Sequence, residues 1–268
     1  MTFLTPLNIP RLLSRRDVDG LIKALTYRKP PAAVVHIASF VRRIPKEAFD
    51  THVVRGRAAK ALGEIGDLSA IEPLVKMLQQ YEDPFVRKET VVALGQIGGL
   101  RVFQVLIDLL QAAGEKESLY FPAWYDPVYC ENIVTAVVDA LIQYNSAAVD
   151  PLIDLLGGSH NDMQRRAIVR VLAKVGDERA LESLLLLLQD SDQVTRRWAV
   201  TGLGKLADVR AVEPLMTALK DSDSVVRENA AEALGLLGDP RAIDALLTLR
   251  KDPDMLVRDT VKEALHQL

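Results

Sequence analysis

Residues 226–239 read VRENAAEALGLLGD, and this stretch decides the fold. It recurs at 54–67 as VRGRAAKALGEIGD and at 86–98 as VRKETVVALGQIG. A leucine lies at the same place in every copy, and the last four of these anchors are 31 residues apart. The anchors are Leu62, Leu94, Leu141, Leu172, Leu203, Leu234 and Leu265. A fixed period of this length indicates an array of similar structural units.

A second helical pattern lies between the anchors. The segment AIEPLVKML at 70–78 matches AVEPLMTAL at 211–219, and each proline lies near the start of its predicted helix, where a missing N–H costs little. Gly-Asp pairs at 66–67, 176–177 and 238–239 end one helix and open the next connection. Each unit is therefore predicted to be two antiparallel helices that must stack on their neighbours to bury an apolar face.

These patterns predict an all-α fold, a right-handed α-solenoid of about seven helix-pair repeats. Residues 1–53 are expected to form atypical N-terminal capping helices, because several prolines interrupt the regular pattern there. Residues 54–268 are expected to form the repeat array.

The run Asp-x-Asp-x-x-Val-Arg, followed by Ala-Ala-x-Ala-Leu-Gly-x-Ile-Gly-Asp, resembles the HEAT-like repeat first named for the E/F-type bilin lyases of phycobilisomes. The resemblance covers residues 54–268. It specifies the fold well and the function poorly, because the same array serves bilin-lyase subunits, assembly factors and general adaptors.

The resemblance also implies a structural ladder. In HEAT-like arrays the arginine seven residues before the anchor bonds an acidic residue of the preceding turn. The arginines here are Arg55, Arg87, Arg165, Arg196, Arg227 and Arg258, and the expected partners are Asp83, Asp162, Asp192, Asp223 and Asp254. We expect these arginines to hold the array together and not to bind phosphate.

The second helices should line one face of the array, which is concave in this family. Trp198 stands out on that face because its register predicts exposure. A tryptophan among arginines is typical of a protein interface; the alternative is a ring half-buried between repeats. The cations predicted to bind a partner with it are Arg170, Lys174, Arg197 and Lys205, and the acidic side chains Glu228, Glu232, Asp259 and Glu263 follow toward the C-terminus.

The interval from Leu94 to Leu141 is 47 residues, about half a repeat too long. The additional residues form an aromatic insertion at about 112–131, and long loops inside compact arrays are usually functional or disordered. We expect this insertion either to contact a partner or to fold back into a groove between repeats. Its aromatic residues are Tyr120, Phe121, Trp124, Tyr125 and Tyr129.

The composition argues against several other functions. The net charge of −3 provides no global field for nucleic acid, and no apolar run reaches the roughly 18 residues needed to span a bilayer. The single cysteine, Cys130, excludes an internal disulfide and fits a reducing, cytoplasmic location. The four histidines show no metal-ligand spacing, so no catalytic residue is assigned and no resident cofactor is expected.

Three functional hypotheses follow. The first is a non-catalytic protein-binding scaffold or assembly factor that uses the concave face and the insertion. The second comes from the resemblance and is a bilin-lyase-like subunit that holds a phycobilin for a phycobiliprotein client, the one case in which the chain would act in an enzyme. The third is an accessory factor for iron–sulfur carrier proteins, in which Cys130 would contribute one contact to a shared cluster.

Overall fold

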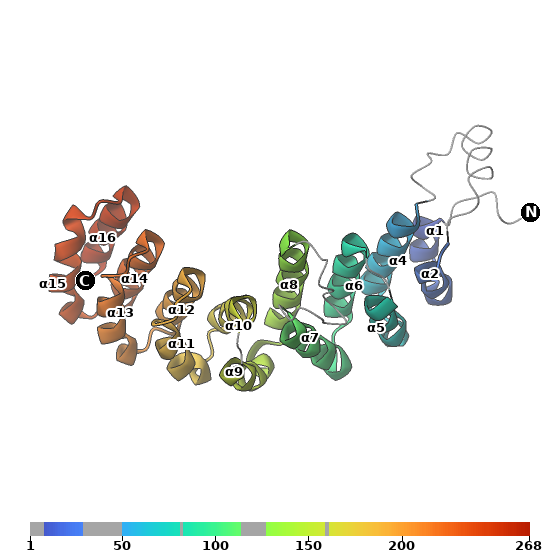
Figure 1. Ribbon diagram of the computed structural model, residues 1–268, viewed down its shortest axis with the longest axis horizontal. Helices are drawn as coiled ribbons and strands as arrows, with labels where there is room; N and C mark the ends of the chain where they lie inside the picture. The colour runs from blue at the N-terminus through green and yellow to red at the C-terminus, as the bar shows by residue number, and fades with distance from the viewer. Residues whose placement is uncertain (1–7, 29–49, 81–82, 114–126, 159–160) are drawn as a thin grey trace, which may run out of the picture. The chain divides into compact units, whose positions relative to one another are not determined.

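The structure is a computed structural model of the chain, and it describes residues 8–28, 50–80, 83–113, 127–158 and 161–268. For 127–131 it describes the backbone alone. The chain divides into two compact units, residues 1–143 and 144–268. All regular elements in the described residues are helices, and none is a strand (Figure 1).

The N-terminal unit contains seven of the described α-helices. They are α1 (Ile9–Ser14), α2 (Val18–Leu25), α4 (Thr51–Ile65), α5 (Ile71–Gln80), α6 (Pro84–Ile97), α7 (Leu100–Ala112) and α8 (Pro127–Ile142). Helix α4 packs between α2 and α6, and α6 packs in turn on α8.

The C-terminal unit contains four successive helix pairs. They are α9 (Val149–Gly157) with α10 (Asp162–Val175), α11 (Leu181–Leu187) with α12 (Gln193–Leu206), α13 (Val212–Ala218) with α14 (Ser224–Leu237), and α15 (Ile243–Thr248) with α16 (Met255–Gln267). The second helices α10, α12, α14 and α16 pack on one another in chain order. This sequential packing within each unit confirms the predicted all-α fold of stacked helix pairs.

The recurring motif residues set the helix ends. The second helices begin at an aspartate or asparagine whose side chain accepts a backbone N–H, as Asp192 does from Thr195 and Asp223 from Val226. Four anchor-containing helices end at a glycine with positive φ: Gly66, Gly98, Gly176 and Gly238. After Gly66, Gly176 and Gly238, an aspartate caps a short 3₁₀ turn that leads into the next first helix.

The anchor leucines form the core of each repeat. The six from Leu62 to Leu234 are fully buried, and only Leu265 in the last helix is partly exposed. Glycines beside the anchors let neighbouring second helices approach closely. A Cβ built on Gly235 would lie 2.8 Å from the Cα of Ala264 on α16.

The predicted domain boundaries are only partly covered by the described residues, and the division into two units adds a boundary that was not predicted. The predicted cap, 1–53, contains α1 and α2, which pack against α4, while 1–7 and 29–49 are not described. The division between the units after Gln143 lies inside the predicted array.

The close approach of α14 and α16 gives a testable prediction. Gly235→Ala should lower the free energy of unfolding by about 1–3 kcal/mol, because the new methyl group meets backbone that cannot move without shifting the helix. Gly157→Ala is the matched control, since nothing lies within 4 Å of its added Cβ. Chemical denaturation of both variants checks this, and equal stabilities would contradict the packing described.

Candidate protein-binding face of the C-terminal unit

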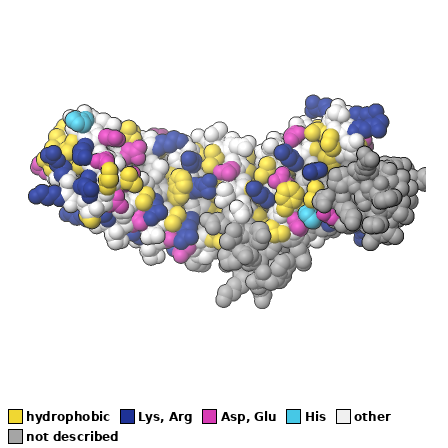
Figure 2. Space-filling model, turned by 90° about the horizontal axis from the view of Figure 1, so that it is seen from above, with side chains coloured by type: hydrophobic (Ala, Val, Ile, Leu, Met, Phe, Trp, Pro, Cys, Tyr) yellow, Lys and Arg dark blue, Asp and Glu magenta, His cyan; other side chains and the backbone are white. Residues whose placement is uncertain are grey.

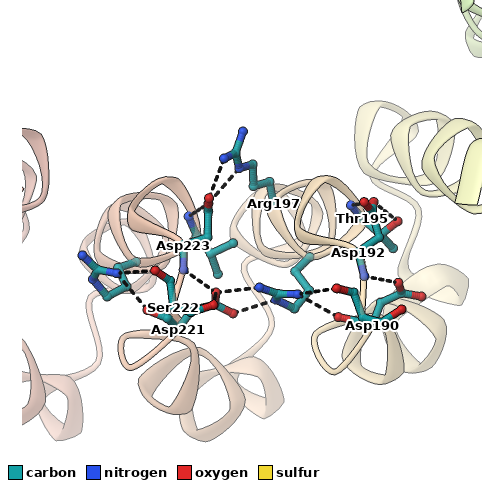
Figure 3. Close-up of polar contacts among 11 residues, drawn as sticks. Asp190, Asp192, Thr195, Arg197, Asp221, Ser222 and Asp223 are labelled. Carbon is teal, nitrogen blue, oxygen red and sulfur yellow. Dashed lines mark hydrogen bonds and ion pairs between the residues drawn. The ribbon is translucent and has the colours of Figure 1, made fainter.

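In the C-terminal unit, Arg196 on α12 and Arg227 on α14 each clamp two loops. Arg196 donates from Nε and Nη2 to the carboxylate of Asp221 in the following repeat, at 2.7 and 2.8 Å. Its Nη1 donates to the carbonyl oxygens of Asp190 and Ser191, at 2.9 and 3.2 Å, in the loop before its own helix (Figure 3). Arg227 repeats this geometry with Asp252 and with the carbonyls of residues 221 and 222.

The carboxylate partners differ from those that the resemblance implied. Asp192 and Asp223 were expected to bind Arg196 and Arg227, but the arginines bind Asp221 and Asp252, two residues before the next helix cap. Asp192 and Asp223 instead cap their own helices and accept hydrogen bonds from Arg166 and Arg197 of the preceding repeat. Arg165 keeps its expected partner, Asp162, and it also binds Asp190.

The remaining predicted ladder residues lie at the ends of the units. Arg258 donates to the carbonyl oxygens of Asp252 and Pro253. In the N-terminal unit, Arg55 donates to the carbonyl of Tyr27, and Arg87 is buried.

A second row of ion pairs runs beside the first. Arg166 donates from Nε to Asp192 at 2.9 Å. Arg197 donates from Nε to Asp223 at 2.8 Å (Figure 3). The Arg166 hydrogen bond lowers the pKa of Asp192 to about 2, and the Arg197 hydrogen bond lowers the pKa of Asp223. These pairs couple each helix cap to the preceding repeat.

Two of the predicted partner-binding cations are thus held by the unit itself. Arg197 belongs to the second row of ion pairs, and Lys205 donates to the carbonyl oxygens of Lys174 and Val175 at the end of α10. A cation at a helix C-terminus is stabilising because it meets unsatisfied carbonyl groups. The sequence missed both roles, since each depends on contacts with the neighbouring repeat.

Trp198 is half-buried, whereas its register predicted exposure. Its ring lies against α10, with Arg170 Cζ 5.7 Å and Lys174 Nζ 5.6 Å from the centroid. Asn229 reaches back from α14 to Thr201 of α12 in the same way, at 3.2 Å. The column five residues before the anchor therefore lies on the seam between second helices, where it is partly covered.

The outward-facing columns are two residues before and two residues after each anchor. In the C-terminal unit they are Arg170, Thr201, Glu232 and Glu263, and Lys174, Lys205, Leu236 and Gln267, all exposed except for Arg170, which is half-buried. This face changes from basic on α10 and α12 to acidic on α14 and α16. Figure 2 shows basic, acidic and hydrophobic side chains interspersed over the unit.

The aromatic insertion falls mostly outside the described residues. Helix α7 ends at Ala112 and α8 begins at Pro127. Tyr120, Phe121, Trp124 and Tyr125 are not described, and neither are the side chains of Tyr129 and Cys130 on α8. Their predicted roles in partner or cluster contact stay predictions.

Metal-binding clusters and membrane-spanning helices are absent from the described ranges. Within them, no group of three or more His, Cys, Asp or Glu side chains could hold a metal ion. None of the helices described is long and apolar enough to cross a membrane.

The repeats match a known protein family. A protein-family model described as HEAT repeats matches residues 48–117, 131–191 and 182–266, most of the chain. The chain belongs to the HEAT repeat family. No protein with a curated description matches it.

Several solved structures are similar to this chain at low identity. The complex of CpcE and CpcF of phycocyanin lyase from Nostoc sp. PCC7120 contains a chain that is 22% identical, with a TM-score of 0.50, and the match covers 62% of this chain and 99% of that one. Human deoxyhypusine hydroxylase is 27% identical, covering 97% and 98%, with a TM-score of 0.41. An engineered protein is 23% identical, covering 94% and 96%, with a TM-score of 0.40. At its identity, the CpcE–CpcF match shows a shared fold.

The lowered pKa of Asp192 gives a pH-dependent prediction. A carboxylate whose pKa falls on folding adds stability above its ordinary pKa, near 4, and loses it as the pH falls toward 2. Asp192→Asn keeps a helix cap but loses the charge, so it should reduce the free energy of unfolding by about 1–2 kcal/mol at pH 7. The difference from the unsubstituted protein should shrink as the pH falls from 4 to 2.

The control is Asp154→Asn, which removes an exposed carboxylate of α9. It should change stability little at any pH. Denaturation curves at several pH values measure both variants, and a pH-independent loss at Asp192 would contradict the role given to its charge.

Proposed function

We propose that this chain is a non-catalytic protein-binding scaffold or assembly factor, and that its partner contacts the second-helix face of the C-terminal unit around Trp198. The observation that carries the proposal is the half-buried indole with the cations Arg170 and Lys174 beside it. Tryptophan and arginine are the residues most enriched among those that dominate binding energy at interfaces.

The framework beneath this face supports a binding role. The clamps of Arg196 and Arg227 are largely buried, since the side chains of both arginines are 13% exposed. The outward columns take no part in these clamps and differ from repeat to repeat. A surface fixed in this way loses little conformational entropy when a partner binds, which favours affinity.

The cluster also indicates the chemistry of the contact. An indole ring offers a large apolar area, while Arg170 and Lys174 favour negative charge at its edge. A partner segment with an apolar or aromatic side chain next to a carboxylate fits this combination. The predicted aromatic insertion at about 112–131 is proposed as a second contact from its sequence.

A second candidate function is a bilin-lyase-like subunit. It is favoured by the same cluster, since two cations beside an aromatic ring suit a planar molecule that carries carboxylates. The fold shared with a chain of the CpcE–CpcF complex of phycocyanin lyase is consistent with this candidate.

The test uses affinity capture with the full chain and two variants. Trp198→Ala should weaken capture of specific partners at least tenfold, because removing an interface tryptophan typically costs about 2 kcal/mol or more. Leu186→Ala is the control, since Leu186 is 78% exposed on the first helix α11. Melting curves of both variants establish that they are folded.

Retention of every partner by Trp198→Ala would contradict the proposed site. The bilin candidate is separated by adding a free linear tetrapyrrole. Visible absorbance that co-elutes with the full chain and is lost in Trp198→Ala supports that candidate over the scaffold.

A further inference from the structure

The second row of ion pairs has a break in the last two repeats. The residue six before the anchor is Arg166, Arg197 and then Glu228, and the helix cap that faces it is Asp192, Asp223 and then Asp254. The first two steps are guanidinium–carboxylate pairs. The third places a carboxylate where the chain twice places a guanidinium.

The electrostatics at this step are unfavourable without a cation. Burial raises the pKa of Glu228, and the negative charges of Asp254 and Glu232 raise it further. Asp254 accepts the backbone N–H of Leu256 at 2.9 Å, and no cation of the described residues forms an ion pair with Asp254 or Glu228. Like charges four residues apart, as Glu228 and Glu232 are, also destabilise a helix.

An apolar side chain continues the same stripe of α14. Glu228, Glu232 and Leu236 are four residues apart in turn, so they lie on one side of the helix. Leu236 is 62% exposed, whereas lysines occupy its column on α10 and α12. The stripe therefore combines two uncompensated carboxylates with an exposed leucine.

We propose that the α14 stripe, together with the helix cap Asp254, is a docking surface for a protein segment that presents arginine. An arginine of the partner would occupy the position between Glu228 and Asp254 that Arg166 and Arg197 occupy in the preceding repeats. A second basic residue would meet Glu232, and an apolar residue would cover Leu236. This surface lies beyond the Trp198 cluster, and the two are tested by different variants.

Arginine is preferred over lysine for a stated reason. In both ion pairs of the second row the arginine donates from Nε and Nη2 to the carboxylate, Arg166 to Asp192 and Arg197 to Asp223. A planar guanidinium can make this two-point contact with a carboxylate, and an ammonium cannot.

The probes are three fluorescein-labelled helical peptides of one length. Each carries two test residues four positions apart and a leucine four positions further on, and the test residues are arginine, lysine or glutamine. Fluorescence anisotropy with the full chain should show tightest binding by the arginine peptide, weaker binding by the lysine peptide and none by the glutamine peptide. Binding should weaken as salt is added, since it depends on charge.

The protein variants place the site. Glu228→Arg should supply the missing guanidinium from the chain itself, so it should raise the melting temperature and abolish arginine-peptide binding. Glu228→Gln should weaken binding at least tenfold while also raising the melting temperature, because it removes the repulsion from Asp254. Asp244→Asn on α15 removes one negative charge, as Glu228→Gln does, and should leave peptide binding unchanged.

Four outcomes would overturn the proposal. The first is that the arginine peptide does not bind the full chain. The second is that it binds the Glu228→Arg variant as tightly as the full chain. The third is that Asp244→Asn weakens peptide binding as much as Glu228→Gln does. The fourth is that calcium alone raises the melting temperature of the full chain but not of Glu228→Gln, which would make the position a metal site.

Discussion

Where one repeat of the C-terminal unit meets the next, loop carbonyl groups have no helical partners, and a single guanidinium donates hydrogen bonds to them. Arg196 satisfies two carbonyls of its own repeat and a carboxylate of the following one. A buried charge is tolerated only when it is paired and fully hydrogen-bonded, and this geometry meets both conditions. Because Arg227 repeats the same contacts 31 residues later, the spacing between successive helix pairs is set twice by the same chemistry.

This clamp separates the residues that build the array from those that face outward. Residues that contact a neighbouring repeat recur along the array: the clamp at Arg196 and Arg227, the capping carboxylates of Asp192 and Asp223, and the glycine directly after four of the anchors. The outward columns make few such contacts, so they vary: cations on α10 and α12, and carboxylates with a leucine on α14 and α16. Binding by a solenoid depends on variation of this kind over a constant frame.

Much of the fold could be predicted from the sequence because the 31-residue repeat can be read directly from residue spacing along the chain. The anchor leucines, the Gly-Asp connections and the helix pairs all follow from spacing along the chain, and the structure has them where the sequence predicts them. The side-chain contacts between repeats could not be predicted as well. The partners of Arg196 and Arg227 lie 25 residues further along the chain, and the cover over Trp198 comes from α10. Such contacts depend on how closely neighbouring helices approach, which the periodicity alone does not specify.

A double-mutant cycle on Arg196 and Asp221 tests most directly whether the guanidinium clamp couples consecutive repeats. Arg196→Met removes the guanidinium, and Asp221→Asn removes the charge while keeping the oxygen that accepts the backbone N–H of Asp223. The free energies of unfolding of the two single variants and the double variant give the coupling between the side chains. We expect a coupling of about 1–3 kcal/mol. Additive effects, with a coupling within about 0.3 kcal/mol of zero, would contradict it.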